Sequence, residues 1–366
     1  MTADFTIVGA GIVGLLAARE LAAAGAQVAV LDRGRPGGES SWAGGGILSP
    51  LYPWRYPEAV TRLAAASQAA WPGLAEALAA EAGVDPQWTR CGLLVGDLDP
   101  GEADTAREWA AGHGVPVEVL DKRGARALEP GLGEVGAPLL WLAEVAQVRN
   151  PRLVRALHRA LERQGVEVRQ GVEVRAIRTR AGRVRDLLTP SGTVPAGQVL
   201  VAAGAWSAGL LAPLGAALPV RPVRGQMILF RGPPGRLRRI VLSRGRYVIP
   251  RRDGHVLAGS TLEESGFDKS VTPEARRELV AEARRIAPVL AELPVVRQWA
   301  GLRPGSPTGV PFLGEHPEIE GLWVATGHYR NGLVLAPASA RLVADLMLGR
   351  VPALDPAPYA PARAAA

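Results

Sequence analysis

Short, continuous runs of apolar residues recur along the chain, and most of them stop at glycine. The first run, residues 5–8, leads into the glycine-rich segment GAGIVG at 9–14. An Ala/Leu-rich stretch over about 15–24 follows and predicts a helix, and a second apolar run, 28–31, ends on Asp32. Continuous apolar runs are typical of strands that are buried on both faces of a parallel sheet. The beginning of the chain is therefore predicted to fold as strand, turn, helix and strand.

The glycines at 9–14 have the spacing of a dinucleotide-binding fingerprint, and they lie in the strand–helix–strand context that it requires. We expect Gly9 to permit the tight turn, Gly11 to let a pyrophosphate approach the backbone, and Gly14 to let the helix pack on the sheet. The free N–H groups and the positive dipole end of the helix attract phosphates. Asp32, 18 residues after Gly14, is placed to accept hydrogen bonds from ribose hydroxyls.

Two further apolar runs end in small residues and are predicted to join the same parallel sheet. They are QVLVAAGAW at 198–206 and GLWVATG at 321–327, and a last helix is predicted over about 333–348. Because the carboxyl ends of parallel strands meet at one edge of a sheet, these segments are expected to face a ligand together. Residues 219–299 instead show alternating patterns typical of strands with one buried face, interrupted by a helix at 273–286. Other predicted elements are helices at 57–82, 102–111 and 150–164 and strands at 90–96, 116–120, 165–169, 172–177, 246–250 and 255–259.

The predicted nucleotide-binding segments are spread over the first, middle and last parts of the chain. A nicotinamide-only dehydrogenase usually completes its binding domain in one stretch, whereas FAD lying extended across a sheet needs contacts from all three parts. We therefore expect an α/β protein with a discontinuous FAD-binding domain (1–87, 147–218 and 300–366). A second, β-rich domain is expected to consist of residues 88–146 and 219–299.

Composition narrows the range of functions. The chain has 366 residues, a formal net charge of +7 and one cysteine, Cys91. Its basic residues are almost all arginines scattered near acidic residues, so nucleic acid is not an expected partner. One cysteine excludes an internal disulfide, and the five histidines show no ligand spacing, so no metal is expected. The strand at the N-terminus and the lack of a long apolar run predict a cytoplasmic chain without stable membrane insertion.

Six segments together resemble the D-amino-acid oxidase and glycine oxidase superfamily of FAD-dependent oxidoreductases. They are GAGIVG at 9–14, SSWAGGG at 40–46, VAAGAW at 201–206, RGQ at 224–226, WAGLRP at 299–304 and GHYRNG at 327–332. The last two are most similar to glycine oxidases of thiamine biosynthesis, and the resemblance covers nearly the whole chain. It implies an FAD-binding domain of the glutathione-reductase type (Rossmann-like), an antiparallel β-rich substrate domain and FAD held without a covalent link.

The resemblance also implies roles for individual side chains. Oxidising an amine moves a hydride from the substrate Cα to flavin N5, and the protein mainly positions the two partners. By similarity, Arg303 holds the substrate carboxylate bidentately, Tyr247 donates its hydroxyl to the same carboxylate, and Arg330 lies at the entrance or on the same anion. Leu262 and Tyr52 are implied to line the substrate pocket.

The last glycine-rich turn is expected to serve the flavin. Asn331 and Gly332 open the last helix, whose N-terminus would stabilise negative charge on the reduced flavin. His328 is expected to shape the backbone and not to act as a general base. The residues expected to contact FAD are Gly9, Gly11, Gly14, Asp32, Arg33, Ser40, Ser41, Ala43, Gly44, Gly45, Val174, Ala203, Gly204, Trp206, Arg303, His328, Arg330, Asn331, Gly332 and Leu333.

The implied activity is the oxidation of glycine and small D-amino acids or N-methylglycine to the 2-oxo acid. Oxygen is the implied acceptor, hydrogen peroxide and ammonia are the other products, and the enzyme is implied to be a homo-oligomer that supplies thiamine thiazole synthesis. Two alternatives stay open. One is an FAD-dependent D-amino-acid dehydrogenase of the same fold that passes electrons to a quinone. The other is a flavoprotein module that modifies RNA, for example a tRNA base.

Overall fold

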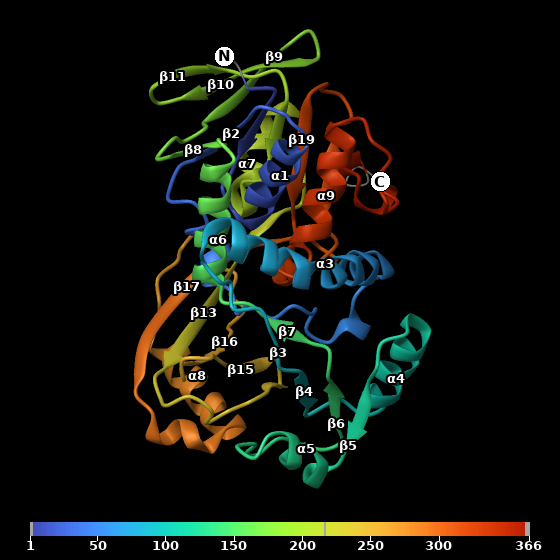
Figure 1. Ribbon diagram of the computed structural model, residues 1–366, viewed down its shortest axis with the longest axis vertical. Coiled ribbons are helices and arrows are strands. Elements are labelled where there is room, and N and C mark those ends of the chain that lie inside the picture. The colour runs from blue at the N-terminus through green and yellow to red at the C-terminus, as the bar shows by residue number, and fades with distance from the viewer. Residues whose placement is uncertain (1–2, 216, 363–366) are drawn as a thin grey trace.

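The computed structural model describes residues 3–215 and 217–362, and two β-sheets form its framework, one in each half of an elongated molecule (Figure 1). The first sheet has six strands in the order β18-β19-β12-β1-β2-β8. Their bounds are β1 Phe5–Val8, β2 Val28–Asp32, β8 Glu167–Gln170, β12 Val199–Val201, β18 Phe312–Glu315 and β19 Leu322–Thr326. All neighbouring strands are parallel except β18 and β19. The four predicted apolar runs therefore do lie in one sheet.

Both faces of the six-stranded sheet are covered, which explains why its strands read as continuous apolar runs. Ile7 and Leu200 point into a core with four helices, whereas their neighbours Val8 and Val201 point into a second core on the opposite face. The helices of the first core are α1 (Ile12–Ala23), α3 (Glu58–Ala82), α6 (Asn150–Arg163) and α9 (Ala336–Met347). The second face carries the three-stranded sheet β9 (Ala176–Arg180), β10 (Arg183–Thr189) and β11 (Gly192–Pro195), with α7 (Ser207–Leu211).

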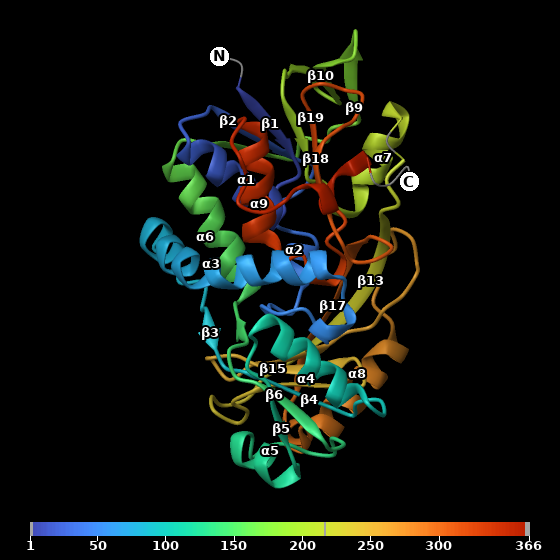
Figure 2. The same cartoon turned by 90° about the vertical axis from the view of Figure 1, so that its right-hand side faces the viewer.

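The second sheet has eight strands in the order β17-β13-β16-β15-β14-β4-β6-β5, antiparallel except for the parallel pair β14 and β4. Their bounds are β4 Leu93–Gly96, β5 Glu118–Leu120, β6 Leu139–Leu142, β13 Arg221–Phe230, β14 Ile240–Ser243, β15 Arg246–Pro250, β16 Val256–Gly259 and β17 Val295–Gly305. Figure 2 shows the two longest strands, β13 and β17, extending from the first half of the molecule into the second. The helix α8 (Pro273–Ile286) covers one face of this sheet.

Several short elements complete the fold. They are β3 (Thr89–Arg90) paired with β7 (Ala146–Gln147), the helices α2 (Ser40–Ala43), α4 (Glu102–His113) and α5 (Lys122–Leu128), and the 3-10 helices Pro53–Arg55, Gly204–Trp206, Ala212–Leu214, Pro288–Glu292, Tyr329–Asn331 and Ala357–Tyr359. Across the described residues, no helix combines the length and the hydropathy that a membrane span needs.

The predicted fold class is confirmed, but some predicted bounds are wrong. The first helix begins at Ile12, earlier than predicted, because the second half of the fingerprint is already helical. Residues 172–175 are not a strand; β9 begins only at Ala176, where pairing with β10 starts. The last helix begins at Ala336, after turns that start at His328. The predicted domain boundary between 299 and 300 falls inside β17, and the division into two domains stays a prediction.

Candidate cofactor and substrate site

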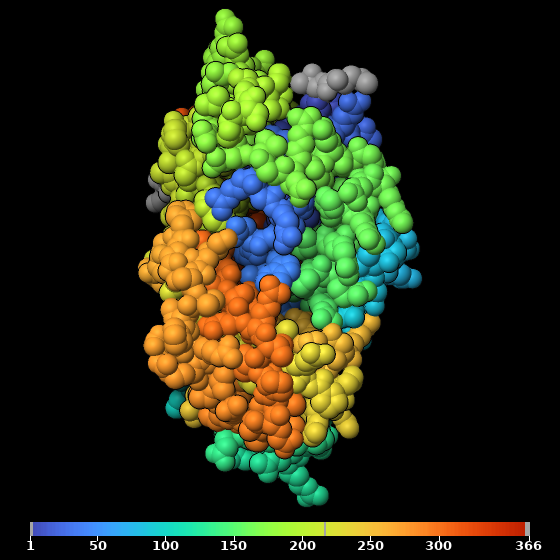
Figure 3. All heavy atoms as spheres, turned by 90° about the vertical axis from the view of Figure 1, so that its left-hand side faces the viewer, coloured from blue at the N-terminus to red at the C-terminus, as the bar shows by residue number. Residues whose placement is uncertain are grey.

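A cavity of about 480 Å³ lies at the carboxyl edge of the six-stranded sheet and is closed from the other side by residues of the eight-stranded sheet. Figure 3 shows a hollow beside the loop that carries residues of about 34–48, coloured blue. The predicted site residues that line the cavity are Gly9, Gly11, Asp32, Arg33, Ser40, Ser41, Gly44, Gly45, Val174, Ala203, Gly204, Trp206, Tyr247, Arg303, His328, Arg330, Gly332 and Leu333. The structure therefore brings together segments that are far apart in the sequence.

The fingerprint glycines adopt the conformations that a phosphate turn needs. Gly9 has φ +110°, and a Cβ there would lie 2.4 Å from the carbonyl oxygen of Ala202. A Cβ on Gly14 would lie 2.0 Å from the carbonyl oxygen of Gly9, so Gly14 serves packing and does not line the cavity. Gly11 has room for a Cβ, whose nearest neighbour would be Ser41 Oγ at 3.4 Å. Gly9 and Gly11 both line the cavity, but only Gly11 has room for a Cβ on that side, so we expect the pyrophosphate to approach there.

Asp32 ties the fingerprint to the loop after β2. Its Oδ2 accepts a hydrogen bond from the Ala10 N–H at 2.7 Å, and its Oδ1 accepts one from the Gly34 N–H at 2.7 Å. A carboxylate has about four acceptor positions, so Asp32 keeps free capacity toward the cavity that it lines. This arrangement suits the predicted contact with ribose hydroxyls.

The glycine-rich loop after Asp32 is fastened from three sides. Ser41 Oγ accepts from the Ile12 N–H at 2.9 Å, and the Ser41 carbonyl accepts from Asn150 Nδ2 at 2.8 Å. Arg251 donates to the Gly45 carbonyl at 2.7 Å, and burial lowers the pKa of Arg251 to about 10. The contacts of Asn150 and Arg251 with this loop were not predicted. In the sequence, Asn150 looks like the start of a helix and Arg251 like the end of a strand.

Arg303 presents a partly buried positive charge to the cavity. Its Nη2 donates to Ser260 Oγ at 2.7 Å, and its Nη1 lies 3.2 Å from the Thr261 carbonyl oxygen. A Cβ on Gly225 would lie 2.1 Å from the same guanidinium, so the arginine rests directly on the glycine backbone. Burial lowers the pKa of Arg303, and the charge of Arg330 acts in the same direction, whereas Tyr247 opposes the shift. Ser260 and Gly225 were not predicted, although Gly225 lies in the RGQ segment.

No carboxylate of the described residues pairs with Arg303. All its hydrogen bonds go to neutral oxygens, the third being the Arg224 carbonyl at 3.3 Å. Arginine stays protonated in proteins, and a buried charge without a counter-ion is costly. The cavity therefore contains a binding position for an anion. Tyr247 is buried beside it, with its hydroxyl 3.4 Å from Met227 Sδ, and Arg330 also lines the cavity.

Two implied substrate-pocket residues lie elsewhere. Leu262 is 45% exposed, because Thr261 turns inward to bond the Gln226 N–H and Glu263 pairs with β13, which leaves the residue between them facing outward. Tyr52 borders a neighbouring surface cavity that it shares with Arg330. Its hydroxyl accepts from the Gly245 N–H at 3.0 Å, and burial raises the pKa of Tyr52.

His328 is a packing residue with a neutral ring. Its Nε2 lies 3.1 Å from Ser339 Oγ, and burial lowers the pKa of His328 to about 4. A ring with this pKa is a weak base, and the expected role of His328 in shaping the turn after β19 stays a prediction. Asn331 is buried next to this turn, and neither it nor Ala43 lines the cavity. Ala43 instead accepts a hydrogen bond from Trp299 Nε1 at 3.0 Å through its carbonyl.

These residues fit an extended dinucleotide. The free N-terminus of α1 and the backbone of Gly44 and Gly45 border the cavity, and the Asn150 Oδ1 atom, also at its wall, is buried without a hydrogen-bond partner among the described residues. A polar ligand would satisfy that acceptor. The fold and the cavity thus define a dinucleotide-binding α/β protein with a separate anion position at the far end of its site.

Comparison with known proteins identifies the family within this class. The family described as DAO, FAD dependent oxidoreductase, matches residues 4–346, and the chain belongs to this family. A glycine oxidase of Pseudomonas aeruginosa is 52% identical, with 99% of each chain covered. The crystal structure of glycine oxidase from Geobacillus kaustophilus superimposes with a TM-score of 0.94, at 34% identity and with 98% of each chain covered. The bifunctional protein ThiO/ThiG of Synechocystis is 35% identical over 95% of this chain, which spans 52% of that protein. The resemblance inferred from the sequence is confirmed.

Proposed function

We propose that the chain is an FAD-dependent amino-acid oxidase that acts on glycine and small D-amino acids or N-methylglycine. The observation that carries this proposal is the partly buried guanidinium of Arg303, which has no carboxylate partner among the described residues and faces the cofactor cavity. A free amino acid has one strong handle, its carboxylate, and a planar guanidinium can hold that group bidentately. The glycine oxidase relatives support the same substrate class.

The chain's own residues bind and orient the substrate. Arg303 is prepositioned by Ser260 and by the backbone of Gly225, so little ordering is required when a carboxylate binds. Tyr247 would donate its hydroxyl to the same carboxylate, and Arg330 would add a second positive charge near the entrance. Bound FAD supplies the acceptor for the hydride that leaves the substrate Cα.

The proposed reaction converts the amino acid and O2 into an imino acid and H2O2. Water then hydrolyses the imino acid to the 2-oxo acid, which is glyoxylate from glycine, and to ammonia, or to methylamine when N-methylglycine is the substrate. Because burial lowers the pKa of His328 to about 4, this ring is too weak a base to take a proton from an ammonium group, so the substrate amine is proposed to bind in its neutral form without a protein base. A homo-oligomeric, cytoplasmic enzyme that supplies thiamine thiazole synthesis completes the proposal, and the name ThiO/ThiG of a relative supports the last point.

A substrate panel read by two detectors tests the proposal. Glycine, sarcosine, D-alanine, L-alanine and methylamine are supplied to the purified holoenzyme, and both O2 uptake and reduction of an artificial dye are measured. We expect glycine, sarcosine or D-alanine to consume O2, and methylamine, which lacks a carboxylate, to be a poor substrate. Dye reduction without O2 uptake would instead indicate a dehydrogenase that uses a quinone. Inactivity toward all amino acids, with salt-dependent RNA retention, would indicate the RNA-modifying alternative.

A further inference from the structure

The segment 261–272, between β16 and α8, reaches from the eight-stranded sheet to the wall of the cofactor cavity. The Phe267 ring stacks on the Trp206 ring, with centroids 5.5 Å apart and planes inclined by 28°. Lys269 Nζ lies 3.0 Å from both carboxylate oxygens of Glu39. Trp206 and Glu39 both line the cavity, whereas Phe267 and Lys269 do not. The segment therefore touches the outer side of the wall.

Further contacts join these residues through Arg33. The Arg33 guanidinium lies 3.8 Å from the centroid of the Trp206 ring and 3.5 Å from Glu39 Oε1. Contacts thus link Phe267, Trp206, Arg33, Glu39 and Lys269 in that order, and we name these five residues the clasp. In Figure 3 the orange part of the chain, which carries residues 261–272, lies against the blue loop beside the hollow. The clasp is the place where the two halves of the molecule meet at this edge of the cavity.

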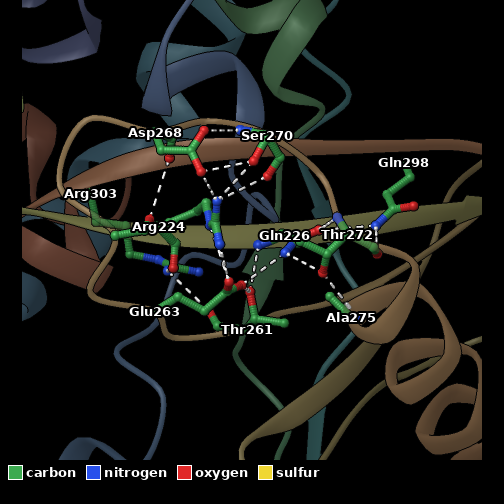
Figure 4. Close-up of polar contacts among 11 residues, drawn as sticks. Arg224, Gln226, Thr261, Glu263, Asp268, Ser270, Thr272, Ala275, Gln298 and Arg303 are labelled. Carbon is green, nitrogen blue, oxygen red and sulfur yellow. Dashed lines mark hydrogen bonds and ion pairs between the residues drawn. The ribbon is translucent and has the colours of Figure 1, made fainter.

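Polar contacts join the segment to β13 (Figure 4). The buried guanidinium of Arg224 donates to Asp268 Oδ2 at 2.6 Å and also pairs with Glu263. The Thr272 N–H donates to Gln226 Oε1 at 2.9 Å, and Thr272 Oγ1 caps α8 by accepting from the Ala275 N–H at 3.2 Å. Because both ends are fixed to β13, the tip with Phe267 and Lys269 is held against the cavity wall at little entropic cost.

Phe267 is unusual because its side chain is 53% exposed and apolar. An aromatic ring exposed to water does not stabilise the fold, whereas a ring stacked on Trp206 holds that side chain in place at the cavity wall. Arg33 directly follows Asp32, the residue expected at the ribose, so the wall that the clasp holds is the one expected beside the adenosine part of FAD.

We infer that Phe267 and Lys269 are positioning residues of the FAD site, which hold Arg33, Glu39 and Trp206 in place and slow the release of the cofactor. The inference rests on the FAD dependence of the family and not on the identity of the substrate. It makes the eight-stranded half of the molecule contribute to cofactor retention through residues that do not line the cavity.

The rate at which FAD dissociates from the holoenzyme tests the inference and requires no catalytic turnover. Holoenzyme is diluted and the rise in free flavin fluorescence gives the dissociation rate for Phe267→Ala, Lys269→Met and their controls. Loss of an aromatic pair should raise that rate about two- to tenfold. Loss of an exposed ion pair should raise it by up to about fivefold. Val271→Ala, another exposed apolar residue of the segment, and Lys122→Met, the other lysine of the chain, should leave it unchanged.

Two more measurements distinguish a specific effect of the clasp on FAD release from a general loss of protein stability. The double variant Lys269→Met/Glu39→Gln should release FAD no faster than the faster single variant, because both remove one interaction. The melting temperatures of the apoproteins should agree within a degree. Equal release rates for wild type, Phe267→Ala and Lys269→Met would overturn the inference even if glycine is oxidised normally. Faster release in an enzyme that ignores glycine would support the clasp and refute only the proposed substrate.

Chemical labelling gives an independent readout. The chain has two lysines, Lys122 and Lys269, so mass spectrometry can follow acetylation of each. Lys269 in the holoenzyme should be acetylated more slowly than in the Glu39→Gln variant, with Lys122 as the internal standard. Equal labelling of Lys269 in both proteins would mean that the ion pair does not persist in solution, and would overturn its part in the clasp.

Discussion

At the scale of single residues, the site depends on a charge that no carboxylate of residues 3–215 and 217–362 pairs with. Within these ranges Arg303 donates only to neutral oxygens, so the bound substrate is expected to provide its counter-ion. A charge-assisted contact contributes about 1.5–3 kcal/mol, and lysine cannot reproduce the planar fork. Arg303→Lys should therefore lose roughly ten- to a hundredfold in kcat/KM for glycine or D-alanine, while the flavin spectrum stays unchanged. Steady-state kinetics measure the loss in kcat/KM. Titration with glycolate measures binding alone, because glycolate presents the same carboxylate without reacting.

Gly225→Ala is the companion variant, because its Cβ would collide with the guanidinium and displace it without removing the charge. It should weaken glycolate binding while the protein remains yellow. Normal kinetics in Arg303→Lys would indicate that Arg330, the other arginine of the predicted anion site, binds the substrate carboxylate instead.

The position of a single side chain can be predicted from the sequence where a motif fixes the backbone. It cannot be predicted where contacts with residues far away in the sequence determine which way the side chain points. Arg303 and Tyr247 were found through the resemblance, and the structure places both at the cavity. Leu262 was expected in the pocket but faces outward, because the pairing of its neighbours with β13 fixes the alternation of side chains. Ser260 and Arg251 carry no local signal, since their importance comes from partners far away in the sequence.

At the scale of elements, the three fingerprint glycines have different tasks. A Cβ on Gly9 or Gly14 would meet a backbone oxygen within 2.4 Å, whereas Gly11 has a φ of −72° that any residue adopts and a Cβ with space around it. Gly11→Val should therefore fold but lose FAD, because its side chain fills the space that the pyrophosphate needs. Gly14→Ala should instead lose soluble, folded protein. Circular dichroism and the flavin-to-protein absorbance ratio distinguish the two, and a full complement of FAD in Gly11→Val would make the fingerprint purely structural.

Element prediction succeeded where apolar runs are continuous and are followed by glycine, as in β1, β12 and β19. It failed at 172–175, because an alternating pattern shows that side chains face two environments but not that a partner strand is present. Residues 172–174 line the cofactor cavity instead. The clasp could not be predicted either, since Phe267 and Lys269 lie in an irregular segment whose contacts come from the other half of the chain.

At the scale of the whole molecule, FAD is expected to bridge the two halves. The cavity takes most of its wall from the six-stranded half, but Tyr247 and Arg303 come from β15 and β17 of the other sheet. Any ligand that binds only the folded state stabilises it, by about 2.7 kcal/mol when its concentration is 100-fold above its Kd. The apoprotein should therefore melt several degrees below the holoenzyme, and added FAD should restore the melting temperature in a concentration-dependent way.

Removal of the cofactor also tests how it is held. The chain's one cysteine, Cys91, is buried and lines a different cavity, burial raises the pKa of its thiol, and Gln147 Nε2 donates to its sulfur at 3.2 Å. A protonated thiol remote from the FAD cavity cannot form a flavin link. Acid precipitation of the yellow protein should thus leave all the FAD in the supernatant and a colourless pellet. Flavin retained in the pellet would show a covalent bond, and a melting temperature insensitive to FAD would show that the cofactor does not join the two halves.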